Sequence, residues 1–322
     1  MITQERMSLL KTRIRYPEGK FFAFSVFDDP DGTTTKNGPE VYRFLYDLGV
    51  ITTKSVWPVK GDQVPAIGGA TCEDLEHLKW VYGLKRQGFE IAFHNATYHS
   101  SRREQVIAGL EQFRKLFGEY PKSHANHADC QDALYWGDAR LTGFNQLMYN
   151  LLTRFRNKGR FLWADPNSEF FWGDKCKQHI KYVRNFVYSD INTLKACPYM
   201  PYFDEQRPFV NYWFASSEGA NCRSFCKTIS EGNQDRLEEE GGACIMYTHF
   251  GHADYFRDGR LNTDFRRLME RLSRKAGWFV PVSVLLDYIQ QARGHCVISP
   301  RERKQLERKW LMERVFVFHG TT

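Results

Sequence analysis

Two adjacent aspartates, Asp28 and Asp29, end the most apolar stretch near the start of the sequence. The run 21–27 is long enough for a strand that is buried on both faces, and Pro30 and Gly32 after it indicate a turn. Charge at the end of a buried strand is costly to desolvate unless a cation or hydrogen-bond donors offset the cost. The aspartate pair is therefore a candidate for acid–base or metal chemistry.

Histidines follow two further predicted strands. His94 and His99 come after the short apolar run 89–93, and His249 comes after the run 244–248. Two imidazoles and one carboxylate are a common ligand set for a catalytic Zn²⁺ that keeps positions open for water. His94 and His99 are five residues apart and cannot share a helical face, so they converge only if their segment is a loop between strand and helix.

Predicted strands alternate with predicted helices along most of the chain, which favours a parallel α/β sheet with right-handed crossovers. The predicted strands cover residues 21–27, 50–59, 89–93, 122–126, 186–189, 209–214, 244–248 and 278–282. Active sites of barrel-like α/β folds lie at the carboxyl ends of the strands, where the aspartates and histidines stand. No glycine-rich dinucleotide motif or Walker motif follows any strand, so neither of these nucleotide-binding chemistries is supported.

The positive charge of the chain lies at its ends. The 322 residues carry a formal net charge of +7, of which residues 1–20 and 297–322 hold +3 each. The remaining +1 is spread over the body, so a nucleic-acid groove through it is not expected.

The cysteines and the hydropathy pattern indicate the cytoplasm. Eight cysteines are scattered without a CxxC pair, a pattern that fits reduced thiols better than a disulfide framework. No apolar run has the length of a signal peptide or a membrane span, so stable membrane insertion is not expected.

The chain resembles the polysaccharide deacetylases with the nodulation-type chitooligosaccharide deacetylase domain, a carbohydrate esterase family. The resemblance covers roughly residues 20–293 and rests on FSVFDDPDG (24–32), GFEIAFHNATYH (88–99), CIMYTHFGH (244–252) and GWFVPVSVLLDYI (277–289). It implies a distorted seven-stranded (β/α) barrel with one divalent metal ion, expected to be Zn²⁺, at the mouth formed by the carboxyl ends of the strands.

The resemblance also implies roles for individual residues. By motif position, Asp29, His94 and His99 correspond to the metal ligands. Asp28 corresponds to the general base, and His249 to the general acid that protonates the leaving amine.

Two departures from the family pattern leave alternatives open. The family spaces its two motif histidines four apart, and the extra residue here makes Asn95 or His127 an alternative metal ligand. The family's third motif contains an arginine that orients the base, but the matching stretch 120–130 has none. His124 or His127 is the alternative partner for Asp28.

Taken together, the sequence predicts a basic N-terminal extension (1–19), a deacetylase-like catalytic domain (20–295) and a basic C-terminal helical tail (296–322). The predicted function is metal-dependent removal of an N-acetyl group from an intracellular, nucleotide- or lipid-linked carbohydrate in surface-polysaccharide synthesis. One alternative is hydrolysis of a small linear or cyclic amide, and another is a non-catalytic sugar-binding or scaffold protein. Homo-oligomerisation is left open.

Overall fold

The first predicted strand forms β1 (Phe22–Asp28), and all seven of its residues are buried. The structure is a computed structural model that describes residues 13–163 and 165–317. In it β1 is flanked on one side by β2 and on the other by β8, both parallel to it. A strand between parallel neighbours that is covered by helices is buried on both faces, which is the reason for its continuous apolar run.

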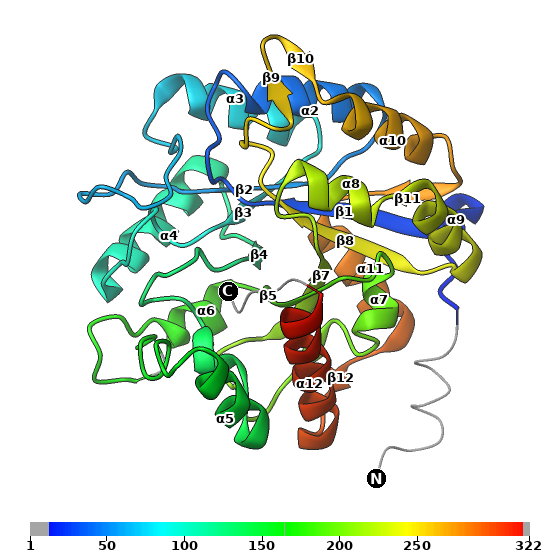
Figure 1. The fold of residues 1–322 in the computed structure, drawn as a ribbon. Coiled ribbons are helices and arrows are strands. Elements are labelled where there is room, and N and C mark those ends of the chain that lie inside the picture. Colours follow the sequence, from blue (N-terminus) through cyan, green and yellow to red (C-terminus); the bar gives the residue numbers. More distant parts are fainter. Residues whose placement is uncertain (1–12, 164, 318–322) are drawn as a thin grey trace.

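Seven parallel strands close into a barrel (Figure 1). They are β1, β2 (Thr53–Val56), β3 (Glu90–Phe93), β4 (Ser123–His124), β5 (Tyr182–Tyr188), β7 (Tyr212–Ser217) and β8 (Ala243–Thr248). Each pairs with the next in this order, and β8 pairs with β1 to complete the ring. The predicted seven-stranded (β/α) barrel is confirmed.

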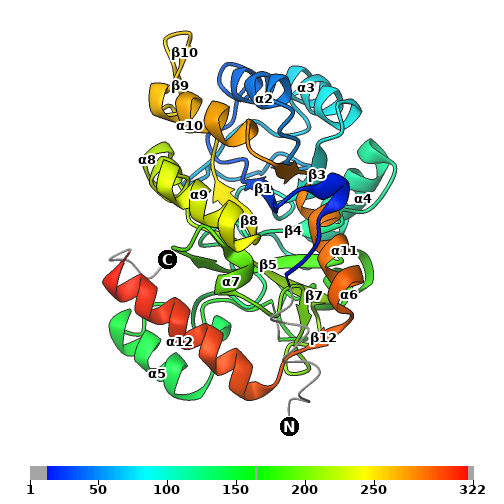
Figure 2. The same cartoon turned by 90° about the vertical axis from the view of Figure 1, so that its right-hand side faces the viewer.

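Helices surround the barrel. They are α2 (Gly38–Asp47), α3 (Leu75–Arg86), α4 (Arg103–Phe117), α5 (Gly143–Leu152), α6 (Gly173–His179), α7 (Thr193–Ala196), α8 (Cys222–Thr228), α9 (Glu231–Glu240), α10 (Thr263–Ser273), α11 (Val282–Arg293) and α12 (Pro300–Phe316), with short 3₁₀ turns η1 (Pro17–Gly19) and η2 (Gly137–Arg140). Both views place α2, α3 and α10 on one side of the molecule and α5 with α12 on the opposite side (Figures 1 and 2). Within the described residues, no helix combines the length and the apolar character that a membrane span requires.

Five short strands lie outside the ring: β6 (Tyr202–Phe203), β9 (Phe256–Arg257), β10 (Arg260–Leu261), β11 (Gly277–Phe279) and β12 (Cys296–Val297). Strand β11 extends the sheet from β1, and β12 pairs with β6, which is antiparallel to β7. Strands β9 and β10 form a separate hairpin, visible at the top of Figure 1.

Helix α12 lies in the predicted C-terminal tail and packs against α5 and β5. Ser299 begins it by accepting a hydrogen bond from the backbone N–H of Glu302, whose side chain accepts one in return from the Ser299 N–H. Its buried face includes Leu306 and Trp310, and the Tyr188 hydroxyl of β5 donates to the Leu306 carbonyl. Residues 1–12 of the predicted N-terminal extension and residues 318–322 of the tail lie outside the described residues.

Strand β5 begins four residues earlier than the predicted strand 186–189. The polar pair Arg184 and Asn185 interrupts the apolar pattern there, although both side chains are buried. A charged side chain inside a buried strand needs a partner, and Arg184 finds one in the site at the barrel mouth.

Candidate active site and metal centre

Three potential metal ligands converge at the carboxyl end of the barrel. Asp31 follows β1, His94 follows β3 and His127 follows β4. Asp31 Oδ1 lies 3.4 Å from His127 Nδ1 and 3.6 Å from His94 Nε2, and these two nitrogens are 3.3 Å apart. Ligand atoms bound tetrahedrally at about 2.1 Å from an ion are about 3.4 Å from one another. The three atoms therefore have the spacing of one face of a tetrahedral metal site.

Two of the three groups have a chemical state that suits a cation. Asp31 Oδ1 is buried and forms no hydrogen bond with any residue that the structure describes. Burial alone would raise the pKa of Asp31, but its contact with His127 and the charge of His249 lower it, which favours the carboxylate. Burial and neighbouring His127 and Arg184 lower the pKa of His94 well below its ordinary value, so its imidazole is neutral and has a lone pair to donate. For the third, His127, burial alone would lower the pKa, but its contact with Asp31 and the Asp31 charge raise it, so a metal ion would have to displace a proton from this ring.

Asp29 lies beside the cluster and forms a two-pronged ion pair with Arg184 of β5. The Arg184 guanidinium donates to both carboxylate oxygens, at 3.0 and 2.6 Å, and Asp29 Oδ1 is 3.7 Å from His94 Nδ1. Burial raises the pKa of Asp29, although the Arg184 charge acts in the opposite direction. The geometry thus holds Asp29 in one orientation, with a pKa shifted toward the range that suits a proton acceptor.

His249, after β8, closes the opposite wall of the site. Its Nδ1 lies 2.7 Å from the Ala220 carbonyl, so Nδ1 carries the proton in the neutral ring. Its Nε2 is directed at the carboxylates, 3.5 Å from Asp31 Oδ2 and 3.9 Å from Asp29 Oδ2, and lies 3.2 Å from the Tyr247 hydroxyl. His249 can therefore exchange a proton at Nε2 with a group bound in the site.

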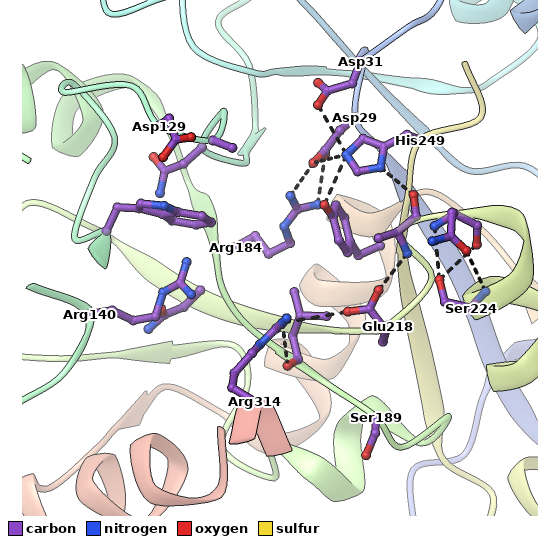
Figure 3. Close-up of a pocket in the computed structure, with 18 of the residues that line it drawn as sticks. Asp29, Asp31, Asp129, Arg140, Arg184, Ser189, Glu218, Ser224, His249 and Arg314 are labelled. Carbon is purple, nitrogen blue, oxygen red and sulfur yellow. Dashed lines mark hydrogen bonds and ion pairs between the residues drawn. The ribbon is translucent and has the colours of Figure 1, made fainter. Parts of the chain in front are cut away.

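The cluster opens into a cavity of about 560 Å³, a volume typical of small-molecule sites (Figure 3). Asp29, Asp31, His94 and His249 line its wall at the barrel mouth. Figure 3 shows Arg140 and Arg314 on the far side of the cavity from Asp31.

Asp28, the residue expected to be the general base, does not line this cavity. Its side chain is fully buried, and Oδ2 accepts hydrogen bonds from Lys54 Nζ at 2.7 Å and the Tyr42 hydroxyl at 2.9 Å. Oδ1 accepts a third, at 2.7 Å, from the Phe250 N–H. The Asp28 side chain therefore links β1 to β2, α2 and the loop after β8 through hydrogen bonds, and the neighbouring Asp29 lines the cavity.

His99, expected to be the second histidine ligand, is directed away from the cluster. Its Nε2 accepts a hydrogen bond from the Asp62 N–H and lies 3.0 Å from the Asp62 carboxylate, while Nδ1 contacts the Ser100 carbonyl at 2.8 Å. Of the three residues expected as ligands, only His94 belongs to the observed cluster. His127, one of the two alternatives that the sequence left open, stands in the position of the second histidine.

Asn95 and His124 form hydrogen bonds around the site but do not belong to the cluster of potential metal ligands. Asn95 Oδ1 accepts the His127 N–H at 3.0 Å, and its amide donates to Asp132 at 2.7 Å. The buried His124 ring contacts the Asn126 amide oxygen and the Phe93 carbonyl. Neither His124 nor His127 is the partner of Asp28.

Two residues of the site were not expected from the sequence. Asp31 was assigned to the turn after the first strand, and Arg184 lies in a strand that was predicted to begin after it. The signal for Arg184 was a positive charge beside Asn185, with apolar or aromatic residues on both sides, in the run YVRNFVY (182–188).

No model of a protein family matches the sequence, and no curated protein matches it either. Among solved structures, a protein of Mycobacterium smegmatis assigned as a polysaccharide deacetylase is 14% identical over 89% of this chain and 97% of its own, with a TM-score of 0.51. One of Pseudomonas aeruginosa PAO1 with the same assignment is 12% identical over 86% of this chain and 93% of its own, with a TM-score of 0.49. The resemblance to polysaccharide deacetylases is thereby confirmed for the fold, on the first of these structures.

Proposed function

We propose that this protein is a metal-dependent hydrolase that removes an N-acetyl group from a carbohydrate. The observation that carries the proposal is the tetrahedral spacing of Asp31, His94 and His127 next to the Asp29–Arg184 pair. This arrangement combines a cation site with a fixed carboxylate and a histidine on the opposite wall, the set of groups that hydrolysis of an amide requires.

Asp31, His94 and His127 would hold the metal ion, which we propose to be Zn²⁺ from the mixed imidazole and carboxylate ligands. A divalent cation in this position supplies a Lewis acid for the substrate carbonyl and makes water a stronger acid. This ligand set replaces the one expected from the sequence, because His99 is engaged with Asp62 and Asp29 with Arg184.

Asp29, in place of Asp28, is the proposed general base. Arg184 fixes the orientation of its carboxylate, and burial raises its pKa, which makes it a stronger proton acceptor than an exposed aspartate. His249 is the proposed general acid, because the Ala220 carbonyl orients its ring and leaves Nε2 facing the cavity. Proton removal and proton delivery are thus assigned to opposite walls of the same site.

The shape of the cavity favours a carbohydrate over a small amide. Aromatic side chains, Trp136, Tyr149 and Phe161, line the wall away from the cluster, and the volume exceeds what a small cyclic amide would fill. The open cluster also favours an enzyme over a scaffold with a collapsed site. The cytoplasmic location, and a nucleotide- or lipid-linked sugar of surface-polysaccharide synthesis as the substrate, stay predictions.

The test is acetate release from N-acetylglucosamine oligomers by protein loaded with Zn²⁺, together with its metal content. Asp29→Asn should keep about one equivalent of metal and lose turnover by at least about 10²-fold, the usual size of a general-base contribution. Asp62→Asn, which alters the exposed partner of His99, serves as the matched control and should leave both quantities unchanged. Full turnover of the Asp29→Asn variant would refute the assignment, and wild-type protein that binds no metal would refute the proposed function.

A further inference from the structure

Arg140, at the end of η2, is a buried cation on the cavity wall that has no anionic partner among the described residues. Its side chain is 4% exposed, and its Nε forms no hydrogen bond. Across residues 13–163 and 165–317, no carboxylate forms an ion pair with its guanidinium, and no acceptor forms a hydrogen bond with it. A buried charge without a partner is costly, so the position calls for a compensating group.

Two tryptophans hold this guanidinium in place. Its central carbon lies 3.8 Å from the ring centroid of Trp136 and 4.8 Å from that of Trp310 on α12. Stacking on aromatic faces attracts a cation but accepts none of its N–H hydrogen bonds. The arginine is thus fixed while its donors are left for another molecule.

The neighbouring charges of the cavity do not neutralise Arg140. The carboxylate of Asp29 is engaged by Arg184, and that of Glu218 lies 3.8 Å from Arg314. The third carboxylate of this wall, Asp129, lies 3.2 Å from Arg160. Burial lowers the pKa of Arg140 to about 9; Tyr149 acts in the opposite direction, and the positive charges of Arg314, Arg184 and Arg207 add to the lowering. The wall around Arg140 is therefore electropositive, and an anion bound there would relieve the repulsion.

We infer that Arg140 binds an oxyanion group of the substrate, a carboxylate or a phosphate, across the cavity from the Asp31 cluster (Figure 3). The inference rests on the proposed function and narrows its substrate to an N-acetylated sugar that carries a negative charge. The planar guanidinium matches both oxyanions, because its N–H groups can donate to two oxygens at once. With the acyl group at the cluster and the anion at Arg140, the sugar ring would occupy the space between them.

The experiment compares binding of N-acetylglucosamine 6-phosphate, N-acetylmuramic acid and neutral N-acetylglucosamine to metal-free protein by calorimetry. Without metal, the phosphate cannot gain affinity by coordinating an ion at the cluster. We expect at least one of the charged sugars to bind about 10- to 100-fold more tightly than the neutral sugar, the range of charge-assisted hydrogen bonds. The charged sugar that gains more identifies the preferred oxyanion.

Arg140→Gln should abolish this gain and leave the affinity for neutral N-acetylglucosamine unchanged, which also shows that the variant is folded. Arg140→Lys keeps the charge and should retain part of the gain. Arg266→Gln, an exposed arginine of α10 paired with Glu270, is the matched control and should retain all of it. No gain in the wild-type protein, or an undiminished gain in Arg140→Gln, would overturn the inference.

Acetate release separates this inference from the proposed function. Turnover of neutral sugars without any preference for charged ones refutes the anion site alone. An Arg140-dependent preference in binding without any release of acetate refutes the deacetylase proposal alone.

Discussion

Replacing Asp28 by Asn should lower the stability of the protein but should not remove a catalytic group. Three donors converge on the Asp28 carboxylate: Lys54 Nζ at 2.7 Å, the Tyr42 hydroxyl at 2.9 Å and the Phe250 N–H at 2.7 Å. Asparagine offers one oxygen and one NH₂ group, so the NH₂ group would face the Phe250 N–H in one orientation of the amide and Lys54 and Tyr42 in the other. The fully buried Lys54 would also lose its counter-ion.

Removing one partner of a buried ion pair costs about 3–5 kcal/mol, mainly because the other charge stays buried and uncompensated. We therefore expect the free energy of unfolding of Asp28→Asn to fall by about that amount in urea titrations. The double variant with Lys54→Met should recover much of the loss, since the stranded charge is then absent. Acetate release per folded molecule should stay near the wild-type value.

Loss of activity without loss of stability in Asp28→Asn would support Asp28 as the general base. A variant that is as stable as the wild type, keeps its metal and has lost turnover would show that the Asp28 carboxylate acts on the substrate. The same pattern in Asp29→Asn, with Asp28→Asn active, would support the assignment drawn from the geometry.

Three further perturbations test the site and its surroundings. His127→Ala should weaken Zn²⁺ binding by at least about 100-fold, whereas His99→Ala should leave the affinity unchanged. Equilibrium dialysis with a competing chelator measures both affinities. A larger loss in His99→Ala than in His127→Ala would contradict the proposed ligand set. His77 is buried without a hydrogen-bond partner for either ring nitrogen, and burial lowers its pKa to about 4. The unfolded state then binds more protons between pH 4 and the ordinary value of 6.5, so stability should fall by roughly 3 kcal/mol as the pH drops through this window. His77→Phe should remove that part of the acid sensitivity, and an identical pH profile in urea titrations would contradict it. Gly251→Ala should weaken metal binding, because a Cβ there would lie 2.5 Å from the Asp31 carbonyl oxygen and force the backbone of Asp31 to move. Unchanged metal affinity in the same dialysis assay would show that the turn tolerates this displacement.

The parallel strands and the edge at which the site lies could be predicted from local patterns. Apolar runs such as β1 and the helical spacing between them depend on neighbours in the sequence, and their alternation predicts parallel strands. Closure of these strands into a barrel was expected from the family resemblance and not from the alternation. His94 and His249 directly follow apolar strands, so their location at the mouth follows from the strand ends alone.

The choice among the carboxylates depended on which way each side chain points. Successive residues of a strand face opposite sides, so Asp28 and Asp29 cannot both enter the cavity. Lys54 of β2 lies opposite Asp28 in the sheet register and forms an ion pair with its carboxylate. Arg184 of β5 forms an ion pair with the carboxylate of Asp29. Asp31 reaches the cluster from the turn that follows β1.

The ligand set also depended on contacts between distant segments. His99 is close to His94 in the sequence but pairs with Asp62, whereas His127 is 33 residues from His94 and lies 3.3 Å from it. Spacing along the chain determines which residues can share a helix or a strand face. Which side chains share a metal ion or a proton is decided by the register of the closed sheet and by the turns at its edge, and these are properties of the tertiary structure.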